Sequence, residues 1–130
     1  MKQTKLNPRK TPLSSMSPTI VFRDKKPFLI TGSPGGSTII TSVLQEILNV
    51  LDFGMSLKES SEKKRIHFQH LPDILFHEQI DESLIKSIKK EKKIVGRNLG
   101  EIHSILIKKD IVEAYSDKRR PDGKASAVYE

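Results

Sequence analysis

The sequence predicts an α+β fold with antiparallel strand pairing. Short β-prone runs occur in neighbouring pairs that are separated by turn residues. Longer intervening segments place apolar residues at helical spacing. Read along the chain, these segments give the order β-β-α-α-β-β-α-β-β-β, in which strands and helices do not alternate regularly, as expected for an α+β domain.

The first strands are expected at residues 19–22 and 28–31, and the polar residues 23–27 form the turn of a hairpin. A glycine-rich turn at residues 32–36 follows and opens a helix at 38–51, with Ser37 as its N-cap. One apolar stripe is expected along this helix, formed by Ile39, Ile40, Val43, Leu44, Ile47, Leu48 and Leu51. Gly54 is the expected left-handed cap that ends it.

The rest of the chain contains two further helices and five strands. Asp81 is the expected N-cap of the last helix. We interpret the Lys-rich residues 86–93 as the solvated face of that helix. The helices are expected at residues 57–62 and 81–92, and the strands at 65–69, 74–78, 94–95, 103–107 and 111–115.

The composition restricts the class of protein. A chain of 130 residues is long enough for one domain. Its formal net charge of +7 favours anionic partners. With 5% aromatic residues and no RNA- or DNA-binding motif, we expect no specific nucleic-acid contact. The absence of cysteine excludes disulfides and thiolate catalysis.

Four histidines raise the question of a metal site. His67 and His70 lie three positions apart on an expected strand, so their side chains point to opposite faces. No nearby carboxylate completes a ligand set, and ordinary polar packing explains these residues. We therefore expect no metal and no cofactor.

The ends of the chain carry no membrane signal. Residues 1–12 are polar and contain two prolines, so we interpret them as a linker or a lost connection. No apolar stretch follows the basic N-terminus, which predicts no signal peptide and a cytoplasmic location for the chain as it stands. The apolar stretch at 39–51 is too short and too polar to span a membrane.

Two short motifs carry candidate chemistry. The turn GSPGGS, residues 32–37, precedes a helix, where unpaired backbone N–H groups and a partial positive charge gather. Gly35 and Gly36 have no Cβ, so their amides can approach an anion or a transition-state oxyanion closely. A phosphate loop would need a lysine that this turn lacks. Ser14 and Ser15 can donate to a carboxylate without adding charge. Taken separately, each motif is also compatible with a plain turn.

Taken together, PLSSMSPTIV (12–21) and LITGSPGGSTIITSVLQ (29–45) closely resemble the γ-glutamyltranspeptidase family, whose members are also called glutathione hydrolases. The resemblance continues through LNVLDFGMSLKES, RIHFQHLPD and LFHE. It is weaker in LGEIHSILI and YSDKRRPDGKASAVY. The sequence departs from the family where SSEKK replaces an Ala- and Pro-containing stretch, and at His103, where glutamine is usual.

The resemblance implies specific roles. Ser14 and Ser15 would hold the α-carboxylate of a γ-glutamyl group, and Met16 would line the same pocket. Gly35 and Gly36 would form the oxyanion hole. The implied fold is the αββα sandwich of the N-terminal-nucleophile hydrolases. Residues 13–130 would form an incomplete part of it, the C-terminal portion of the small subunit.

The resemblance also implies what this chain lacks. The family nucleophile is a threonine upstream of the PLSSM motif, and Thr4 and Thr11 do not have its sequence context. A γ-glutamyl substrate such as glutathione would therefore require the rest of the small subunit and the large subunit as partners. Three hypotheses follow: a fragment that is inactive alone, one chain of a split enzyme, or a small basic binding protein. Family members are commonly periplasmic or extracellular.

Overall fold

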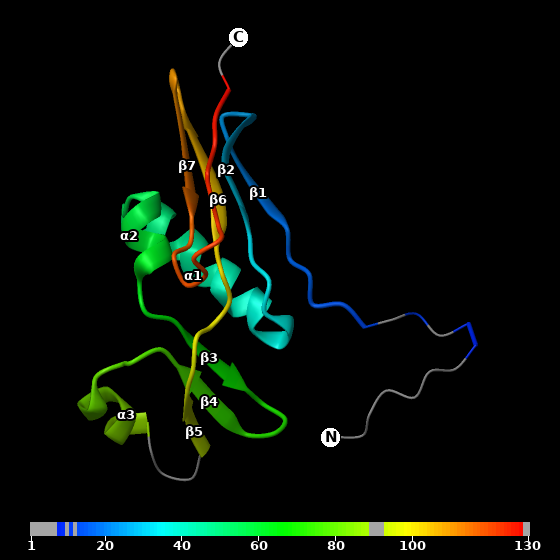
Figure 1. Cartoon of the computed structure of the whole chain (residues 1–130), viewed down its shortest axis with the longest axis vertical. Coiled ribbons are helices and arrows are strands. Elements are labelled where there is room, and N and C mark those ends of the chain that lie inside the picture. Colours follow the sequence, from blue (N-terminus) through cyan, green and yellow to red (C-terminus); the bar gives the residue numbers. More distant parts are fainter. Residues whose placement is uncertain (1–7, 10, 12, 89–92, 129–130) are drawn as a thin grey trace.

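A computed structural model describes residues 8, 9, 11, 13–88 and 93–128 of the chain. Two β-sheets and their helices form the described part, which confirms the α+β prediction (Figure 1). The larger sheet and two helices form one end, and the smaller sheet with the third helix forms the other.

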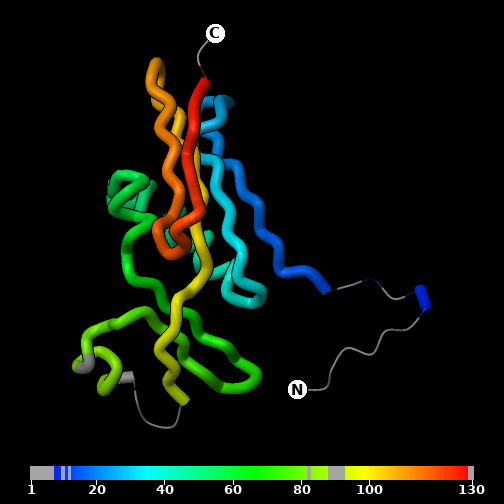
Figure 2. The backbone as a smooth tube through the Cα atoms, in the orientation of Figure 1, coloured from blue at the N-terminus to red at the C-terminus, as the bar shows by residue number. Residues whose placement is uncertain are grey.

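The larger sheet has four strands in the order β1-β2-β6-β7, and every neighbouring pair is antiparallel. The strands are β1 (Thr19–Arg23), β2 (Lys26–Gly32), β6 (His103–Lys108) and β7 (Ile111–Ser116). Two hairpins build it, as predicted, and their turns contain residues with positive φ, at Asp24, Lys25 and Lys109. After β7 the chain turns and runs back toward the tip of the β6–β7 hairpin (Figure 2).

Helices cover one face of this sheet. These are α1 (Ile39–Leu51), which follows a short 3-10 turn at Gly36–Thr38, and α2 (Leu57–Glu62). The core between them and the sheet contains Phe28, Leu29, Val50, Leu57 and Leu106. On the opposite face, large apolar side chains remain exposed, among them Ile20, Phe22, Ile105 and Val112.

The smaller sheet has the order β3-β4-β5, with β3 (Ile66–Gln69), β4 (Ile74–His77) and β5 (Lys93–Gly96). Strands β4 and β5 are parallel, so the expectation of antiparallel pairing throughout is wrong. The reason is the connection between them, which contains α3 (Glu82–Ile88) and allows the chain to return in the same direction. The predicted helix end at residues 89–92 lies outside the described residues.

Two details of α1 differ from prediction. Ser37 does not cap the helix but lies in the preceding 3-10 turn, and the N-cap position is Thr38, without a side-chain capping bond. The apolar stripe is also narrower than expected, because Ile40, Leu44 and Leu48 are exposed. Gly54, in contrast, has the predicted left-handed conformation, with φ 66°.

The buried face of α1 includes polar residues in place of the three exposed apolar ones. Glu46 is 1% exposed and lies among hydroxyl groups. Its Oε2 accepts a hydrogen bond from Ser60 Oγ at 2.6 Å, and its Oε1 accepts from Ser61 Oγ at 3.3 Å and Ser104 Oγ at 3.1 Å. Burial raises the pKa of Glu46, although these hydrogen bonds act in the opposite direction. These hydrogen bonds orient α1 about its own axis, so that the face of the helix that carries Glu46 packs against α2 and β6.

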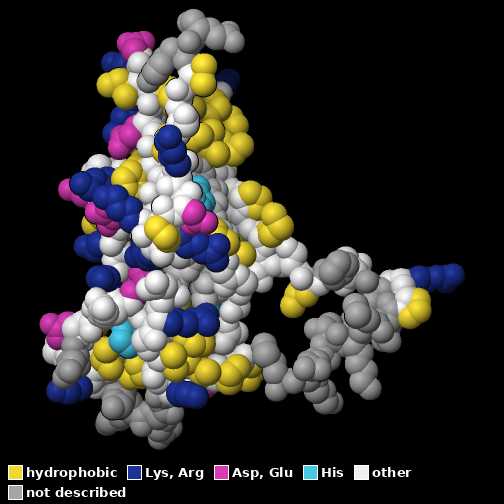
Figure 3. Space-filling model, in the orientation of Figure 1, with side chains coloured by type: hydrophobic (Ala, Val, Ile, Leu, Met, Phe, Trp, Pro, Cys, Tyr) yellow, Lys and Arg dark blue, Asp and Glu magenta, His cyan; other side chains and the backbone are white. Residues whose placement is uncertain are grey.

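The third helix begins as predicted. Asp81 Oδ1 accepts a hydrogen bond from Ser83 N at 2.7 Å, which is the capping interaction expected at this position. Within the described part of the chain, no helix has the length and apolar character needed to cross a membrane. Lys and Arg side chains are interleaved with Asp and Glu over the visible face of the molecule (Figure 3).

Candidate functional site

The register of the first hairpin brings the two candidate motifs to the same end of the sheet. Thr19 at the start of β1 pairs with Thr31 near the end of β2. The segment before β1 and the turn after β2 therefore leave the sheet side by side. Ser14 and Ser15 precede Thr19 by five and four residues, and Gly35 and Gly36 follow Thr31 by the same two separations.

The glycine turn, residues 32–36, presents backbone donors at the surface. Gly35 has φ 140° and Gly36 has φ 60°, both in the region that favours glycine, and both residues are exposed. Thr38 anchors the turn, because its N–H and its Oγ1 both donate to Gly35 O, at 3.3 Å and 2.9 Å. Within the described residues, the Gly35 and Gly36 amides donate to no protein acceptor. They are therefore available to an external acceptor.

A loop that is distant in the sequence holds the glycine turn in place through a hydrogen bond. Glu101 N donates to Ser33 Oγ at 3.0 Å, and Ser33 Oγ donates to Pro34 O at 2.7 Å. Gly100 in this loop has φ 68° and lies against the turn. We call residues 99–102 the backing loop. Its importance was not predicted from the sequence, where LGEIHSILI was noted only as a weaker part of the family resemblance.

A buried ion cluster lies on the other side of the backing loop. Arg65 Nη2 is 2.8 Å from Asp117 Oδ2, and Arg119 bridges Asp117 Oδ1 at 2.9 Å and Glu78 Oε2 at 2.5 Å. Burial alone would raise the pKa of both carboxyls. For Glu78, the hydrogen bonds from Arg119 outweigh this effect of burial. For Asp117, the hydrogen bonds from the backbone amides of Ile102 and Arg119 and from the Arg65 side chain outweigh it. Both pKa values therefore lie below their ordinary range.

The ion cluster also binds the backbone of the backing loop. Glu78 Oε1 accepts from Leu99 N at 2.6 Å, and Arg65 Nη1 donates to Leu99 O at 2.9 Å. Asp117 Oδ2 accepts from Ile102 N at 3.0 Å. The loop is therefore fixed at both ends by charged, buried partners. The members of this cluster lie in the segments RIHFQ, LFHE and YSDKRR, and no local pattern in any one segment indicates that they meet.

The serine segment, residues 13–18, has no regular secondary structure and is held by local contacts. Ser14 Oγ accepts from Met16 N at 3.2 Å, and Ser17 Oγ donates to Ser15 O at 3.1 Å. Met16 is 76% exposed, so no closed pocket surrounds it within the described residues. The hydroxyl of Ser14 and the partly buried Ser15 remain close enough to the surface to meet a ligand.

A hollow of about 230 Å³ borders the glycine turn, with Pro34, Gly35, Gly100 and Glu101 among its lining residues. Larger hollows, of about 740 and 780 Å³, lie over the ion cluster and between the hairpin tips. We place the candidate site at the smallest of the three, because it is the one that contains residues of the glycine turn.

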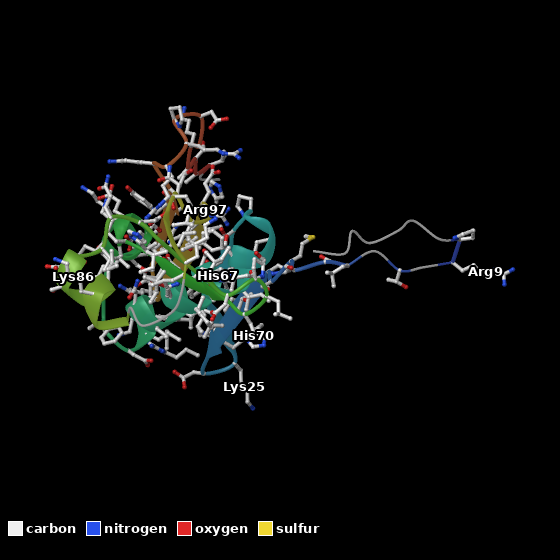
Figure 4. The ribbon with its side chains drawn as sticks, turned by 90° about the horizontal axis from the view of Figure 1, so that it is seen from below. Arg9, Lys25, His67, His70, Lys86 and Arg97 are labelled. Atoms are coloured by element: carbon white, nitrogen blue, oxygen red, sulfur yellow. The ribbon has the colours of Figure 1, made fainter. Side chains whose placement is uncertain are left out.

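The histidines do not form a metal centre within the described residues. His67 is buried in β3, with its Nδ1 2.8 Å from Thr41 Oγ1 and its Nε2 3.0 Å from Gln69 Oε1. His70 lies beyond the end of β3, so the expectation that both occupy one strand is wrong (Figure 4). The turn that follows Gln69 takes His70 out of the strand and exposes it.

Comparison with known proteins identifies relatives. The family model described as Gamma-glutamyltranspeptidase matches residues 2–127. The chain is 44% identical over 108 residues to the glutathione hydrolase proenzyme of Escherichia coli (strain K12), which covers 81% of this chain and 19% of that protein. It is 39% identical over 105 residues to the glutathione hydrolase proenzyme of Bacillus subtilis (strain 168), covering 78% of this chain and 18% of that one. The chain thus spans about a fifth of the length of these curated relatives.

Solved structures agree with the sequence comparison. A highly active mutant of gamma-glutamyltranspeptidase from Pseudomonas nitroreducens superposes with a TM-score of 0.85 at 34% identity, covering 96% of this chain and 68% of that chain. A mutant of the Helicobacter pylori gamma-glutamyltranspeptidase gives a TM-score of 0.78 at 39% identity, covering 88% and 66%. These matches confirm the predicted fold class, an incomplete αββα sandwich. The described residues hold a helical layer and the sheet beside it.

Proposed function

This chain belongs to the gamma-glutamyltranspeptidase family, and on that premise we propose that it contributes the carboxylate-binding and oxyanion-binding parts of a site that cleaves or transfers a γ-glutamyl group. Because the chain spans about a fifth of its curated relatives, the remaining parts of the site would come from other segments of the enzyme. Residues 13–130 would then be the C-terminal portion of a small-subunit domain.

The observation that carries this proposal is the glycine turn. Two exposed amides, with no acceptor among the described residues, lie on a turn that a distant part of the chain holds in place. Amides fixed in this way stabilise a negative oxygen more strongly than mobile water does, because they need no reorganisation as the charge develops. The serine segment leaves the sheet at the same end. A γ-glutamyl amide has a carboxylate at one end and the scissile carbonyl at the other, which matches two such groups of donors.

The reaction assigns a role to each motif. A threonine hydroxyl, supplied by another segment, attacks the γ-carbonyl carbon, and the threonine α-amine accepts the hydroxyl proton. The carbonyl oxygen becomes an oxyanion that accepts hydrogen bonds from the Gly35 and Gly36 amides. When the C–N bond breaks, the leaving amine takes the proton and a γ-glutamyl ester remains. Water or an acceptor amine then attacks this ester and regenerates the hydroxyl. Ser14 and Ser15 hold the α-carboxylate throughout, beside Met16.

The names of the relatives suggest the γ-glutamyl donor. Both bacterial relatives are called glutathione hydrolase proenzymes, so we propose glutathione or a related γ-glutamyl amide as the substrate. In this proposal the chain alone does not catalyse turnover, since neither Thr4 nor Thr11 acts as the nucleophile. The fragment and split-enzyme hypotheses share these residue roles and differ in whether a complementing chain exists.

Complementation tests the proposal. The chain is assayed for hydrolysis of a γ-glutamyl anilide, first alone and then with the remaining segments of a family enzyme. We expect no turnover alone and measurable turnover in the assembly. Ser14→Ala combined with Ser15→Ala should raise KM, because each lost hydrogen bond to a charged carboxylate costs roughly 1.5–3 kcal/mol. Ser87→Ala, on α3, is the matched control. An assembly that forms but does not act on γ-glutamyl amides contradicts the proposal, and an unchanged KM contradicts the serine assignment.

A further inference from the structure

The glycine turn meets the backing loop backbone to backbone, and this contact depends on Gly100. We propose that Gly100 is a positioning residue for the oxyanion hole: the missing side chain at this position, together with the Ser33 hydroxyl, sets the direction of the Gly35 and Gly36 amides. The catalytic meaning of this inference rests on the proposed function. The geometric part concerns the chain itself and can be measured separately.

Steric evidence shows how close the contact is. A Cβ atom added to Gly100 would lie 2.5 Å from Ser33 Oγ, 2.9 Å from Ser42 Oγ and 3.2 Å from Pro34 O. The first two distances are shorter than Cβ atoms tolerate, so the neighbouring groups would have to move. From the opposite side, a Cβ at Gly35 would lie 3.3 Å from Gly100 Cα. Gly100 therefore borders the space that a side chain on Gly35 would need, and a side chain on Gly100 would meet Ser33 and Pro34, the two residues before Gly35.

The Ser33 hydroxyl joins the two segments across this contact. Its Oγ accepts from Glu101 N at 3.0 Å and donates to Pro34 O at 2.7 Å. One hydroxyl thus connects the backing loop to the residue immediately before Gly35. A displacement of Ser33 would reach Gly35 through Pro34, the one residue between them.

The backing loop is held more firmly than the glycine turn. Leu99 and Ile102 bind Glu78, Arg65 and Asp117 of the buried ion cluster. The turn is exposed and open to solvent on its other side. The Ser33 hydroxyl could move away from a Cβ at position 100 only by losing its bonds to Glu101 N and Pro34 O, and Pro34 O itself belongs to the backbone of the turn. A side chain at position 100 would therefore displace the turn. The aim of the two amides would then change.

Gly54 provides a matched control for the backbone. It has φ 66°, against 68° for Gly100, so an alanine suffers the same conformational strain at both positions. A Cβ at Gly54 would meet nothing within 4 Å. Comparing Gly100→Ala with Gly54→Ala therefore isolates the contacts at position 100, which are with Ser33 and Pro34 of the turn and with Ser42 of α1.

The decisive experiment uses the assembled enzyme with this chain isotopically labelled. For Gly100→Ala we expect shifted amide resonances of Gly35 and Gly36, and a loss in kcat of about a hundredfold, as a displaced catalytic group typically gives. The KM for a γ-glutamyl anilide should stay the same, because the substrate carboxylate is bound elsewhere. Gly54→Ala should leave both the resonances and kcat unchanged. Equal effects of the two variants, or a raised KM with normal kcat, would overturn the inference.

A second variant keeps the inference testable if Gly100→Ala fails to fold. Ser33→Ala removes the bridging hydroxyl without adding bulk, so it should shift the same two resonances and lower kcat by about tenfold, a smaller displacement than the steric one. No change in either quantity would overturn the inference. If the resonances shift but the assembly does not act on γ-glutamyl amides, the positioning role stands and the proposed function fails. If the assembly is active but neither variant moves the resonances, the positioning role fails alone.

Discussion

The two halves of the candidate site are held in place very differently. The glycine turn is connected to a residue far away in the sequence, through the bond from Glu101 N to Ser33 Oγ at 3.0 Å. Among the described residues, the side-chain hydrogen bonds of the serine segment reach only two residues along the chain. The difference teaches that the oxyanion geometry is built into the described residues, whereas the carboxylate-binding geometry requires further contacts.

Conformational entropy explains why this difference matters. Ordering the backbone of one residue costs roughly 1–2 kcal/mol. Hydrogen bonds between residues that are two positions apart in the chain do little to offset that cost. The glycine turn avoids the cost at the moment of binding, because the backing loop orders it beforehand. We therefore expect the serine segment to become ordered together with the substrate or with a neighbouring segment.

The largest expected effect comes from removing the support of the backing loop. Arg119→Ala leaves Glu78 and Asp117 buried without one of their cationic partners, and breaking a buried ion pair in this way costs about 3–5 kcal/mol. Urea denaturation followed by circular dichroism measures the loss in the free energy of unfolding. Amide resonances of the glycine turn should broaden or shift in the folded variant, while those of residues 13–18 stay unchanged.

Arg120→Ala is the matched control for this experiment. Arg120 is 67% exposed and forms an ion pair with Glu101 at 3.0 Å, so its removal should cost less than about 1 kcal/mol. Similar losses in the free energy of unfolding for the two arginine variants would show that the ion cluster does not stabilise the backing loop.

A smaller effect is expected from filling space inside the glycine turn. Gly35→Ala places a Cβ 2.7 Å from Thr38 Oγ1 and keeps φ near 140°, a region that L-residues rarely adopt. Strain of this kind costs about 1–3 kcal/mol. Gly32→Ala is the control, because a Cβ at Gly32 would meet nothing within 4 Å. If thermal denaturation gives the same melting temperature for both variants, the turn is not as firmly held as the comparison requires.

The pH dependence of stability should separate the two buried acidic clusters. The pKa values of Glu78 and Asp117 lie below their ordinary 4.5 and 3.8. Their stabilising contribution is complete above those ordinary values and is lost as the pH falls through the lowered ones. The pKa of Glu46 lies above 4.5 because of burial, so the free energy of unfolding falls as the pH rises from 4.5 through the raised value.

Isosteric variants test these opposite signs. Glu46→Gln should flatten the decline on the higher-pH side, and Glu78→Gln should weaken the loss in acid. Urea midpoints measured across the pH range provide the comparison. The assignment of the acid-sensitive step to the ion cluster would be wrong if Glu78→Gln kept the full acid dependence.

Local sequence patterns predicted most elements of the fold. The helix Leu57–Glu62 has the predicted bounds, and the strands agree with prediction to within one or two residues, because turn residues and apolar periodicity act over a few positions. The parallel pairing of β4 and β5 was missed, since strand direction depends on the path of the intervening helix rather than on either strand. The burial of Glu46 in place of Leu44 was missed for a related reason. Its partners Ser60, Ser61 and Ser104 lie 14 to 58 residues away.

The same distinction between local patterns and distant contacts applies to the candidate site. Gly35, Gly36, Ser14 and Ser15 could be proposed from the sequence because they stand in compact motifs. Gly100 was not identified, because its importance arises from contact with Ser33 across 67 positions of the chain, and neither residue looks unusual in its own segment. Residues that act through distant contacts have no local signature.

The smallest effect is expected from matched serine substitutions in the two halves of the site. Ser33→Ala removes two hydrogen bonds that fix the glycine turn, so the free energy of unfolding should fall by about 0.5–1.5 kcal/mol. Ser14→Ala with Ser15→Ala removes one local bond, from Met16 N to Ser14 Oγ, and leaves the bond from Ser17 Oγ to the Ser15 carbonyl, so stability should change by less than about 0.5 kcal/mol. Urea denaturation of the three proteins under one set of conditions decides the matter. A double variant as destabilised as Ser33→Ala would mean that the serine segment is already anchored without substrate, and the contrast between the two halves would disappear.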